Sequence, residues 1–481
     1  MNLVENPWIP VVGTDGASRL ASLADVFREG DRIADLSANP CQRIALMRLL
    51  ICIAQAALDG PADEDEWRTC RSRIGEAALS YLAKWQSRFN LFGEGAFLQV
   101  DGLEQKPNSL ADKLEFSLAA GNNPTLYDHE ATKAGRVAVD GPLALRLLVY
   151  QAFSPGGLIG SVTWGDHVTL GTSEHAPCIE GSMLHTYLRG ANLLESICWN
   201  LITREQLDLM MGVEWGAPCW EAETLSASNL MPMTKTYLGR LVPVSRCIRL
   251  VSNNPAITLA ASIRYPKLPD FREPSATVRK IKRGKDEVLA YLPVNPSKHV
   301  WRELGAILAM QDADKKGGAI SLLNLRLQQG GTFDIWAGGL AADKAKLVDM
   351  CEWNVTIPVE MIDSLALATY QQGVHIADTS SRSLYAAIKA YAEFMKSEAV
   401  WVQEAQRIFW ADLDGQCDLL VQCSTGVQSV DDKWVAVVRT AMQQAYERTC
   451  PHGTPRQIEA YAQGWRLLEA WKGGPDRGSD D

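Results

Sequence analysis

The feature that most constrains the fold is a change in sequence texture near residue 356. Before it, proline and glycine interrupt the chain often, and segments of β type mix irregularly with helical ones. After it, both residues thin out and apolar residues recur every three or four positions, the period of an amphipathic helix. A chain of 481 residues has room for two or three domains. We therefore predict an α+β fold, with an irregular mixed domain at 1–356, an all-α four-helix bundle at 357–472 and a disordered tail at 473–481.

Four helices are expected after residue 356, with 359–370 as an additional or lead-in helix. Ser429 is a candidate cap of the third helix, and Thr454 followed by Pro455 opens the fourth. The apolar stripes are expected to form the core of the bundle. They comprise Leu384, Ile388, Tyr391 and Met395; Val400, Ala405 and Phe409; Trp434, Val437, Val438, Ala441 and Ala445; and Ile458, Tyr461, Trp465, Leu468 and Trp471.

The first 356 residues predict fewer regular elements. Asn39 followed by Pro40 indicates the start of a mostly buried helix, because asparagine caps helices and proline suits the first helical position. Residues 239–244 and 245–251 favour strands, and Arg246 lies near one end of the second. Strands and helices do not alternate regularly, which argues against a doubly wound sheet.

Residues 275–291 predict a hairpin whose tip is the strongest positive patch in the chain. The chain as a whole carries a net charge of −10, whereas a free-standing nucleic-acid binder is usually basic. Contact with nucleic acid would therefore need local patches or a larger basic assembly. The basic tip comprises Arg279, Lys280, Lys282, Arg283 and Lys285.

The cysteines and the apolar runs point to a chain of the cytoplasm without disulfides. The 11 cysteines are scattered, no C-x-x-C occurs, and the closest pair is Cys417 and Cys423. This pattern argues against a disulfide framework and a zinc ribbon. No uninterrupted apolar run reaches the roughly 18 residues of a membrane span. The opening residues 1–5 lack the features of a signal peptide.

Common catalytic motifs are missing from the sequence. There is no G-x-S-x-G, Walker A or H-E-x-x-H sequence, and no G-x-G-x-x-G after a strand. Asp128 with His129, or His167 with His175, offer metal-ligand types, although adjacent residues point in different directions. We expect no catalytic residue, metal or cofactor. A metal- or cysteine-dependent enzyme that uses the Asp128/His129 region is the alternative.

Two glycine-rich segments have unusual backbone freedom. One is 154–160, directly after the helical run 143–153, and the other is 336–346, which contains Gly338 and Gly339. Without a Cβ atom, a backbone can approach a partner closely. The ordinary explanations are a helix C-cap for the first segment and a tight turn for the second.

Short segments in a fixed order resemble the large subunit of the type I-E CRISPR Cascade complex, the CasA family. They cover essentially the whole chain: 2–11 (NLVENPWIPV), 91–99, 122–129, 150–157, 188–190, 301–304, the Gly338-Gly339 turn and the helical C-terminus. The resemblance implies a non-catalytic subunit of an RNA-guided surveillance complex. Its N-terminal domain would recognise the protospacer-adjacent motif (PAM) in double-stranded DNA, and its bundle would pack along the assembly. Base pairing with the guide would read the remaining target.

The resemblance also implies three elements that read the PAM from the minor groove and open the duplex. This groove is only about 6 Å wide, so a backbone without side chains enters it more easily. In the family the wedge carries an amide side chain at its tip, where this chain has Lys344. The implied residues are a glycine loop at Gly156, Gly157 and Gly160; a lysine finger at Lys267, with Arg264 as the rival; and a wedge at Asp343, Lys344 and Ala345.

Two further contacts follow from the resemblance. The segment 126–137 would touch the RNA handle or the PAM region through Tyr127, His129, Lys133 and Arg136, or else be a solvent-facing loop. The basic tip would form a phosphate rail for DNA, or simply aid solubility. Relatives with a zinc site carry paired cysteines where this chain has Asp140 and Leu143, so no zinc is expected.

The implied partners are the guide crRNA, PAM-containing double-stranded DNA, the backbone, small and handle-capping subunits of the complex, and the CRISPR nuclease-helicase. No membrane partner is expected. The second alternative is a purely structural interaction protein, in which the helical bundle makes the contacts and the loops touch no nucleic acid.

Overall fold

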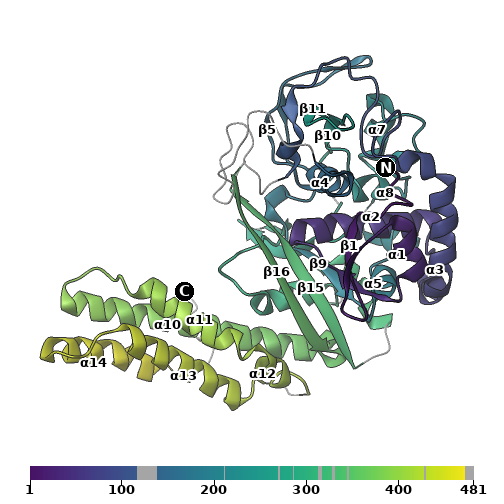
Figure 1. Ribbon diagram of the computed structural model, residues 1–481. Helices are drawn as coiled ribbons and strands as arrows, with labels where there is room; N and C mark the ends of the chain where they lie inside the picture. The colour runs from purple at the N-terminus through teal and green to yellow at the C-terminus, as the bar shows by residue number, and fades with distance from the viewer. Residues whose placement is uncertain are drawn as a thin grey trace. The chain divides into compact units, whose positions relative to one another are not determined.

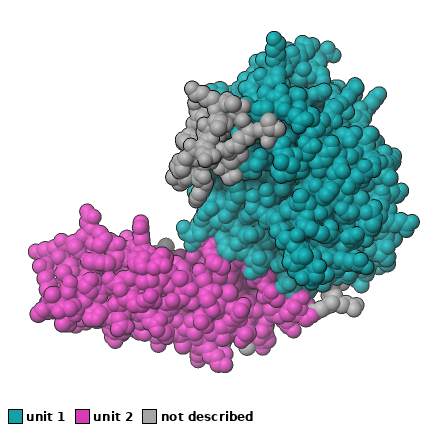
Figure 2. Space-filling view, in the orientation of Figure 1, with its two compact units in different colours: residues 1–297, 315–329, 333–354 teal, residues 298–314, 330–332, 355–481 magenta. Residues whose placement is uncertain are grey.

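The computed structural model divides into two compact units (Figure 1; Figure 2). Unit 1 comprises residues 1–297, 315–329 and 333–354, and unit 2 comprises 298–314, 330–332 and 355–481. Unit 1 contains both helices and strands, so the mixed α+β class is confirmed; a domain boundary at residue 356 stays a prediction. The structure describes residues 1–115, 138–210, 212–268, 271–284, 286–311, 317–327, 331–343, 346–426 and 429–471; the tail 473–481 lies outside them.

Unit 1 is built around the buried helix α2 (Pro40–Leu58). Asn39 and Gln42 form a reciprocal capping box at its start, as the Asn39-Pro40 pair predicts. Its Pro40–Gln55 portion is mostly buried. By length and composition α2 is also the one described helix that could cross a membrane, but core helices pass the same test.

Other helices pack around α2. Direct neighbours are α3 (Glu64–Lys84), α4 (Asp140–Phe153), α5 (Leu193–Trp199) and α8 (Tyr237–Leu241). The remaining helices of unit 1 are short: α1 (Leu23–Glu29), α6 (Arg204–Met210) and α7 (Ala227–Met233).

The strands of unit 1 form small sheets whose described pairings are antiparallel. Three-stranded sheets have the orders β2-β1-β3, β10-β11-β4, β13-β12-β14 and β16-β15-β9, and β5 pairs β8 as β6 pairs β7. Their bounds are β1 Ile9–Gly13, β2 Ser18–Ala21, β3 Ile33–Leu36, β4 Ser109–Leu110, β5 Gly157–Leu158, β6 Thr163–Trp164, β7 His167–Val168, β8 Thr172–Ser173, β9 His185–Arg189, β10 Arg246–Arg249, β11 Ala256–Ala261, β12 Thr277–Arg283, β13 Asp286–Tyr291, β14 Gly318–Ala319, β15 Thr332–Asp343 and β16 Lys346–Pro358.

The predicted strand at 239–244 is wrong, because its first half belongs to α8. Gly239 lies against the backbone of Met233, where a side chain would clash, so the chain turns tightly there. Pro243, which cannot continue a helix, follows two residues after α8 ends. The neighbouring prediction at 245–251 is confirmed as β10, and the hairpin at 275–291 as β12 and β13.

The predicted tight turn at Gly338 and Gly339 is also wrong, because both glycines lie inside β15. A Cβ atom at Gly338 would come within 2.7 Å of the Trp336 ring and of the Cys351 carbonyl on β16. One at Gly339 would lie 2.8 Å from the carbonyl of Met183. Close packing on both faces of the strand therefore selects glycine here.

The longest helix of unit 2 is α10 (Ser364–Met395), of 32 residues. The lead-in helix predicted at 359–370 and the first predicted helix form this one element, after a short 3-10 turn (Val359–Ile362). Asp363 caps α10 by accepting the N–H groups of the second and third helical residues. Gly373 lies inside this helix. The Leu420 side chain packs so close to it that an added Cβ atom would clash, which explains the glycine.

Four more helices follow: α11 (Val402–Asp414), α12 (Cys417–Gln422), α13 (Asp432–Thr449) and α14 (Pro455–Ala470). α10 packs against α11, α13 and α14, and α11 packs against α13. The Thr454-Pro455 start is confirmed, with a capping box to Gln457. The Ser429 cap is wrong, because Asp431 directly precedes the helix and accepts the Lys433 N–H. The short α12 was not predicted.

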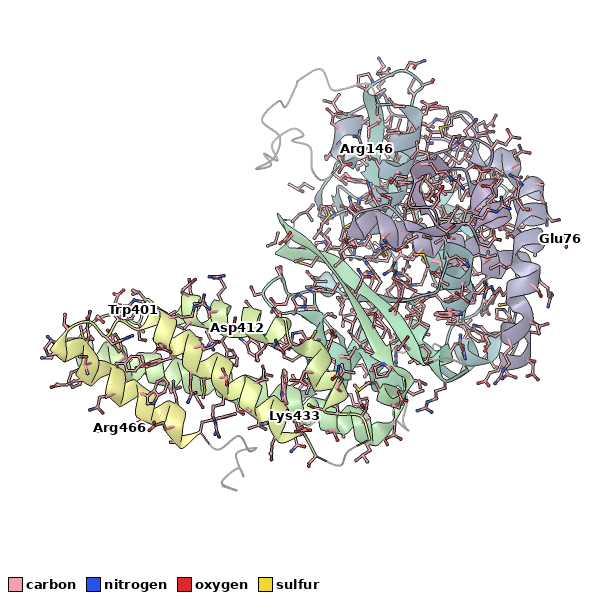
Figure 3. The ribbon with its side chains drawn as sticks, turned by 60° about the horizontal axis from the view of Figure 1, so that its bottom comes forward. Glu76, Arg146, Trp401, Asp412, Lys433 and Arg466 are labelled. Atoms are coloured by element: carbon pink, nitrogen blue, oxygen red, sulfur yellow. The ribbon has the colours of Figure 1, made fainter. Side chains whose placement is uncertain are left out.

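Aromatic side chains form much of the core of unit 2. Trp301, next to the short helix α9 (Leu304–Ile307), packs against Trp410 and Trp434 with ring centroids 6.3 and 6.0 Å away. Its Nε1 donates to Asp414 Oδ1 at 2.6 Å. Charged residues such as Lys433 occupy the outer surface (Figure 3).

Candidate nucleic-acid interface

The glycine loop begins where α4 ends, at Phe153. The helix cap is Ser154 in an extended conformation, so the glycines do not serve as its C-cap. The chain then forms β5, in which Gly157 pairs with Ser173 and Leu158 with Thr172. Leu158 is 90% exposed, so β5 itself presents only backbone and one apolar side chain to solvent, beside the hydroxyls of Thr172 and Ser173 on β8.

The three glycines of the loop differ in the structural requirement that each one meets. A Cβ atom at Gly156 would lie 3.0 Å from backbone atoms of residues 173–175, so close packing requires its absence. Gly160 has φ +86°, a conformation that favours glycine. Gly157 has φ +153° and no atom within 4 Å of a built Cβ. No described residue therefore fills the space above Gly157.

His175 lies directly behind the loop. The Gly156 N–H donates to its Nδ1 at 3.2 Å, which requires that this nitrogen carry no proton. Sequence analysis considered His175 only as a metal ligand paired with His167. In the structure it instead holds the backbone at the start of the glycine loop.

The end of β15 is anchored to the turn that precedes β9. Ser182 Oγ accepts the Ala342 N–H at 2.9 Å and lies 3.2 Å from the Ala342 carbonyl, to which it can donate. Asp343 ends β15 and Lys346 begins β16, so the predicted wedge is the connection between two long paired strands. Lys344 and Ala345 themselves lie outside the described residues.

A surface pocket of about 470 Å³ joins these two elements. His175, behind the glycine loop, lines one part of it, and Ala341 and Ala342, at the end of β15, line another. The glycine loop and the strand end that carries the predicted wedge therefore lie on the same side of unit 1. The other lining residues are Ile179, Gly181, Ser182, Pro293, Val294 and Val348.

Both candidates for the lysine finger lie beside this pocket. Lys267 Nζ pairs with Glu180 Oε1 at 2.6 Å, and Arg264 Nη1 with Glu174 Oε1 at 3.3 Å. The hydrogen bond to Glu180 raises the pKa of Lys267. Exposed ion pairs of this kind are weak, so a nucleic acid can replace the carboxylate partner at small cost. The geometry does not choose between the two.

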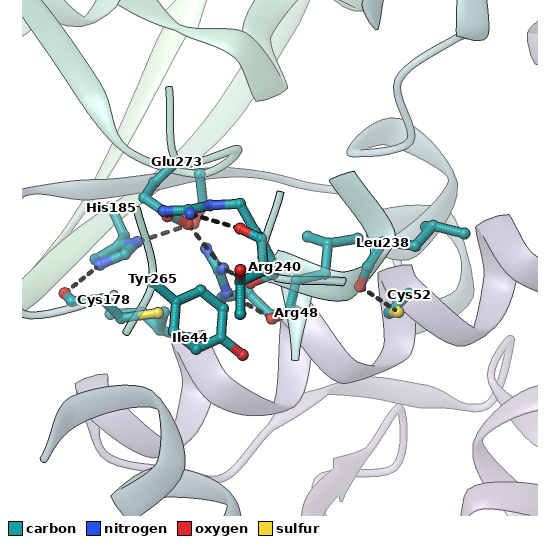
Figure 4. A network of polar contacts seen from close by, with 12 residues as sticks. Ile44, Arg48, Cys52, Cys178, His185, Leu238, Arg240, Tyr265 and Glu273 are labelled. Carbon is teal, nitrogen blue, oxygen red and sulfur yellow. Dashed lines mark hydrogen bonds and ion pairs between the residues drawn. The ribbon is translucent and has the colours of Figure 1, made fainter. Parts of the chain in front are cut away.

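A buried ionic network anchors the segment that carries these cations (Figure 4). Glu273 binds Arg48 at 2.9 Å and Arg240 at 2.8 Å, and all three side chains are buried. Arg240 also donates to the carbonyl of Pro266 at 3.2 Å, next to Lys267. Burial alone would raise the pKa of Glu273, but the two arginines together outweigh it and hold the pKa below its ordinary value.

The basic tip is less strongly positive than its sequence implies. In the hairpin register Lys282 lies opposite Glu287, and Arg283 lies opposite Asp286. Side chains also alternate between the two faces of β12, so Arg279 and Arg283 lie on one face and Lys282 on the other. Lys285 lies outside the described residues. The structure therefore divides the four described cations, Arg279, Lys280, Lys282 and Arg283, between two faces and sets acids opposite two of them.

Four predicted contact residues lie outside the described residues: Tyr127, His129, Lys133 and Arg136. The same holds for Asp128, on which the enzyme alternative depends. Among the described residues, no group of three or more His, Cys, Asp or Glu side chains could hold a metal ion. Asp140 and Leu143 both belong to α4.

The described cysteines offer little support for a cysteine nucleophile. Nine are buried, and only Cys351 and Cys417 are partly exposed. Burial raises the pKa of Cys351 to about 11 and also raises that of Cys417, which keeps both thiols protonated at neutral pH.

Fold and site together define a two-unit α+β protein with a surface pocket between His175 and the end of β15, and comparisons with known proteins assign its family. The family model of CRISPR-associated protein Cse1 matches residues 2–449. The CasA/Cse1 protein of Thermus thermophilus is 26% identical over 509 aligned positions, which cover 96% of this chain and 95% of that protein. The chain therefore belongs to the CRISPR-associated Cse1 family, and the resemblance to the CasA family is confirmed.

Solved structures share the fold over nearly the whole chain. The crystal structure of Thermus thermophilus CasA has a TM-score of 0.78 at 22% identity and covers 98% of both chains. A chain of a CRISPR RNA-guided surveillance complex has a TM-score of 0.77 at 18% identity and covers 98% of this chain and 99% of that one.

Three residues were missed as contributors to this site: His175 and Ser182, which line the pocket, and Arg246, which donates to the Pro155 and Glu174 carbonyls. Each acts on the backbone of a residue distant in sequence, such as Ser182 on Ala342. The one available signal was Arg246 at the start of the strand that its apolar neighbours Cys247 and Ile248 predict.

Proposed function

We propose that this protein is the non-catalytic large subunit of an RNA-guided surveillance complex and that it reads the PAM of double-stranded DNA from the minor groove. The observation that carries the proposal is the pocket lined both by His175, which accepts the Gly156 N–H of the glycine loop, and by Ala341 and Ala342 at the end of β15. Family membership and the likeness to a chain of a CRISPR RNA-guided surveillance complex support it.

The glycine loop suits entry into a narrow groove. The exposed Gly157 has no described neighbour within 4 Å of the position a Cβ atom would take, so no described residue fills the space that a base edge would occupy. Degenerate readout in the minor groove would tolerate several PAM sequences. Gly156 and Gly160 give the loop its close packing and its turn.

The β15–β16 connection would act as the wedge that opens the first base pairs. Minor-groove proteins unstack base steps with inserted side chains at a cost of a few kcal/mol per step. With Lys344 at the tip, the stacking of an amide is lost, and an ammonium that pairs with a displaced phosphate replaces it. Asp343 and Ala345 flank it. Duplex opening at this point starts the R-loop.

The remaining contacts complete the proposed assembly. Lys267 or Arg264 would contact the DNA beside the glycine loop, the basic tip would hold phosphates, and residues 126–137 would reach the guide RNA or the PAM. The helices of unit 2 would form a four-helix bundle along the other subunits. The displaced strand would pass to the CRISPR nuclease-helicase, and the complex would work in the cytoplasm.

The direct test replaces Gly157 with valine in the assembled complex. We expect at least about tenfold weaker binding of a PAM-containing duplex, because the new side chain occupies the space of the groove wall. Gly16→Val is the matched control: Gly16 also has positive φ, +81°, and no atom within 4 Å, but lies in the β1–β2 turn. Both variants should assemble normally. Unchanged duplex binding by Gly157→Val would remove the glycine loop from PAM recognition.

A further inference from the structure

The side chain of Arg246 lies beneath the glycine loop. Arg246 begins β10, and only 2% of it is exposed. Its Nη2 donates to the carbonyls of Pro155 at 2.9 Å, Glu174 at 2.8 Å and Ser154 at 3.3 Å. Its Nη1 donates to the carbonyl of Ser245 at 2.7 Å. One guanidinium therefore joins the backbone that enters the loop to the backbone that leaves its paired strand, β8.

The position of Arg246 is itself fixed by Gln151 of α4. The Arg246 N–H donates to Gln151 Oε1 at 2.9 Å, and Gln151 Nε2 donates to the Arg246 carbonyl at 3.0 Å. Gln151 Nε2 also donates to the Leu98 carbonyl at 2.9 Å. Both side chains are buried, so the main chain of Arg246, from which the guanidinium reaches the loop, is fixed by the helix that precedes the loop.

The acceptors of the Arg246 guanidinium are carbonyl oxygens. No carboxylate among the described residues pairs with it. The carboxylate of Glu174 pairs instead with Arg264, on the surface. Burial lowers the pKa of Arg246 to about 10, and Arg246 still carries its charge at neutral pH. A lysine ammonium also has three N–H donors, but they rotate about one nitrogen and lack the rigid planar geometry with which Nη1 and Nη2 of the guanidinium reach four carbonyls.

We propose that Arg246 is a positioning residue that clamps residues 154–156 to residue 174 and so sets how strongly the protein distinguishes a PAM from other duplex sequences. The inference rests on the proposed function of the glycine loop. Arg246 is buried and touches no DNA. It acts through the shape of the backbone at Gly156 and Gly157, which must be rigid to reject a wrong base pair.

The experiment compares Arg246→Lys and Arg246→Gln with the control Arg249→Lys in the assembled complex. Arg249 lies at the other end of β10, half exposed, where its Nη1 pairs with Asp101 at 3.2 Å. Binding is measured to a PAM-containing target duplex, to the same duplex with a scrambled PAM, and to a PAM duplex whose target strand is already unpaired.

We expect both Arg246 variants to bind the PAM duplex about tenfold more weakly, since hydrogen bonds from a charged donor are lost. Binding to the scrambled duplex and to the unpaired target should not change, and Arg249→Lys should resemble the parent. An unaltered PAM preference overturns the proposal, and so does an equal loss on all three DNAs, which a general folding defect would produce.

Amide hydrogen exchange on the free full-length chain separates this proposal from the proposed function. In Arg246→Lys the amides of Gly156 and Ala176, which bond to His175 and to the Ser154 carbonyl, should exchange faster than in Arg249→Lys. Unchanged exchange at these amides refutes the clamp. A further outcome is that the parent complex binds the PAM and scrambled duplexes equally, while amide exchange in Arg246→Lys changes as expected. That result would refute the proposed function and support the role of Arg246 in holding the loop.

Discussion

At the scale of single residues, the structure relies on buried arginines that act on the backbone. Arg48 and Arg240 share Glu273, and Arg246 binds four carbonyls, so three guanidinium groups fix segments far apart in sequence. Breaking such a group leaves an uncompensated charge in the interior, which costs more than the loss of a surface pair.

The Glu273 network gives a stability prediction. Glu273→Gln should lower the free energy of unfolding of unit 1 by about 3–5 kcal/mol, because two buried arginines lose their charged partner. Chemical denaturation followed by tryptophan fluorescence measures the change. The exposed Glu404, paired with Arg407, supplies the control Glu404→Gln, which should change little.

The same network predicts a pH dependence. The pKa of Glu273 is lower in the folded than in the unfolded protein, so its contribution is present above the unfolded value of about 4.3 and is lost as pH falls through the folded value. The stability difference between the parent and Glu273→Gln should therefore shrink upon acidification below about pH 4. A difference that stays constant down to about pH 2 would contradict this assignment.

At the scale of elements, the β12–β13 hairpin has a mixed charge pattern. Acids on β13 lie opposite two of the cations on β12, namely Glu287 opposite Lys282 and Asp286 opposite Arg283. The two acids therefore reduce the positive charge that the hairpin presents to phosphates. Charge substitutions on the two strands should act in opposite directions.

Reversing the charges of the basic tip to glutamate should weaken DNA binding by the complex and flatten its salt dependence. Each lost phosphate contact reduces the slope of log K against log salt by about 0.9. Neutralising the opposed acids, with Glu287→Gln and Asp286→Asn, should strengthen binding. Titrations at several salt concentrations measure both. An identical slope in all variants would leave the tip without a role in DNA binding.

Elements with a local cause were predictable from sequence. The starts of α2 and α14 follow from Asn39-Pro40 and Thr454-Pro455, because capping depends on residues within one turn. The glycines of β15 were not assigned correctly, since what selects them is the approach of Met183 and Cys351 from other parts of the chain. The reach of Arg246 back to the glycine loop has the same non-local origin.

At the scale of the whole molecule, the chain passes between the two units more than once. Residues 298–314 belong to unit 2, although unit 1 supplies the residues before and after them. Trp301 in this segment is buried, with its indole bonded to Asp414 and Tyr370 bonded to its carbonyl. The helices after residue 356 therefore lack part of their core when taken alone.

A fragment of residues 357–472 should consequently be much less stable than the same helices in the full chain. Loss of a buried tryptophan typically costs about 3–5 kcal/mol, and Trp301→Ala in the full chain should reproduce much of that loss. Thermal unfolding followed by circular dichroism measures both. A fragment as stable as the parent unit would support a domain boundary at residue 356.

The interrupted chain also has a consequence for synthesis on the ribosome. Segment 298–314 emerges before the helices that bury Trp301 have been translated. Its apolar side chains therefore stay exposed to solvent in the nascent protein until those helices follow. Residues 333–354, which complete the sheet of unit 1 that contains β9, also emerge only after segment 298–314. Neither unit can finish folding until most of the polypeptide has left the exit tunnel, and chaperones have their greatest opportunity to bind during that interval.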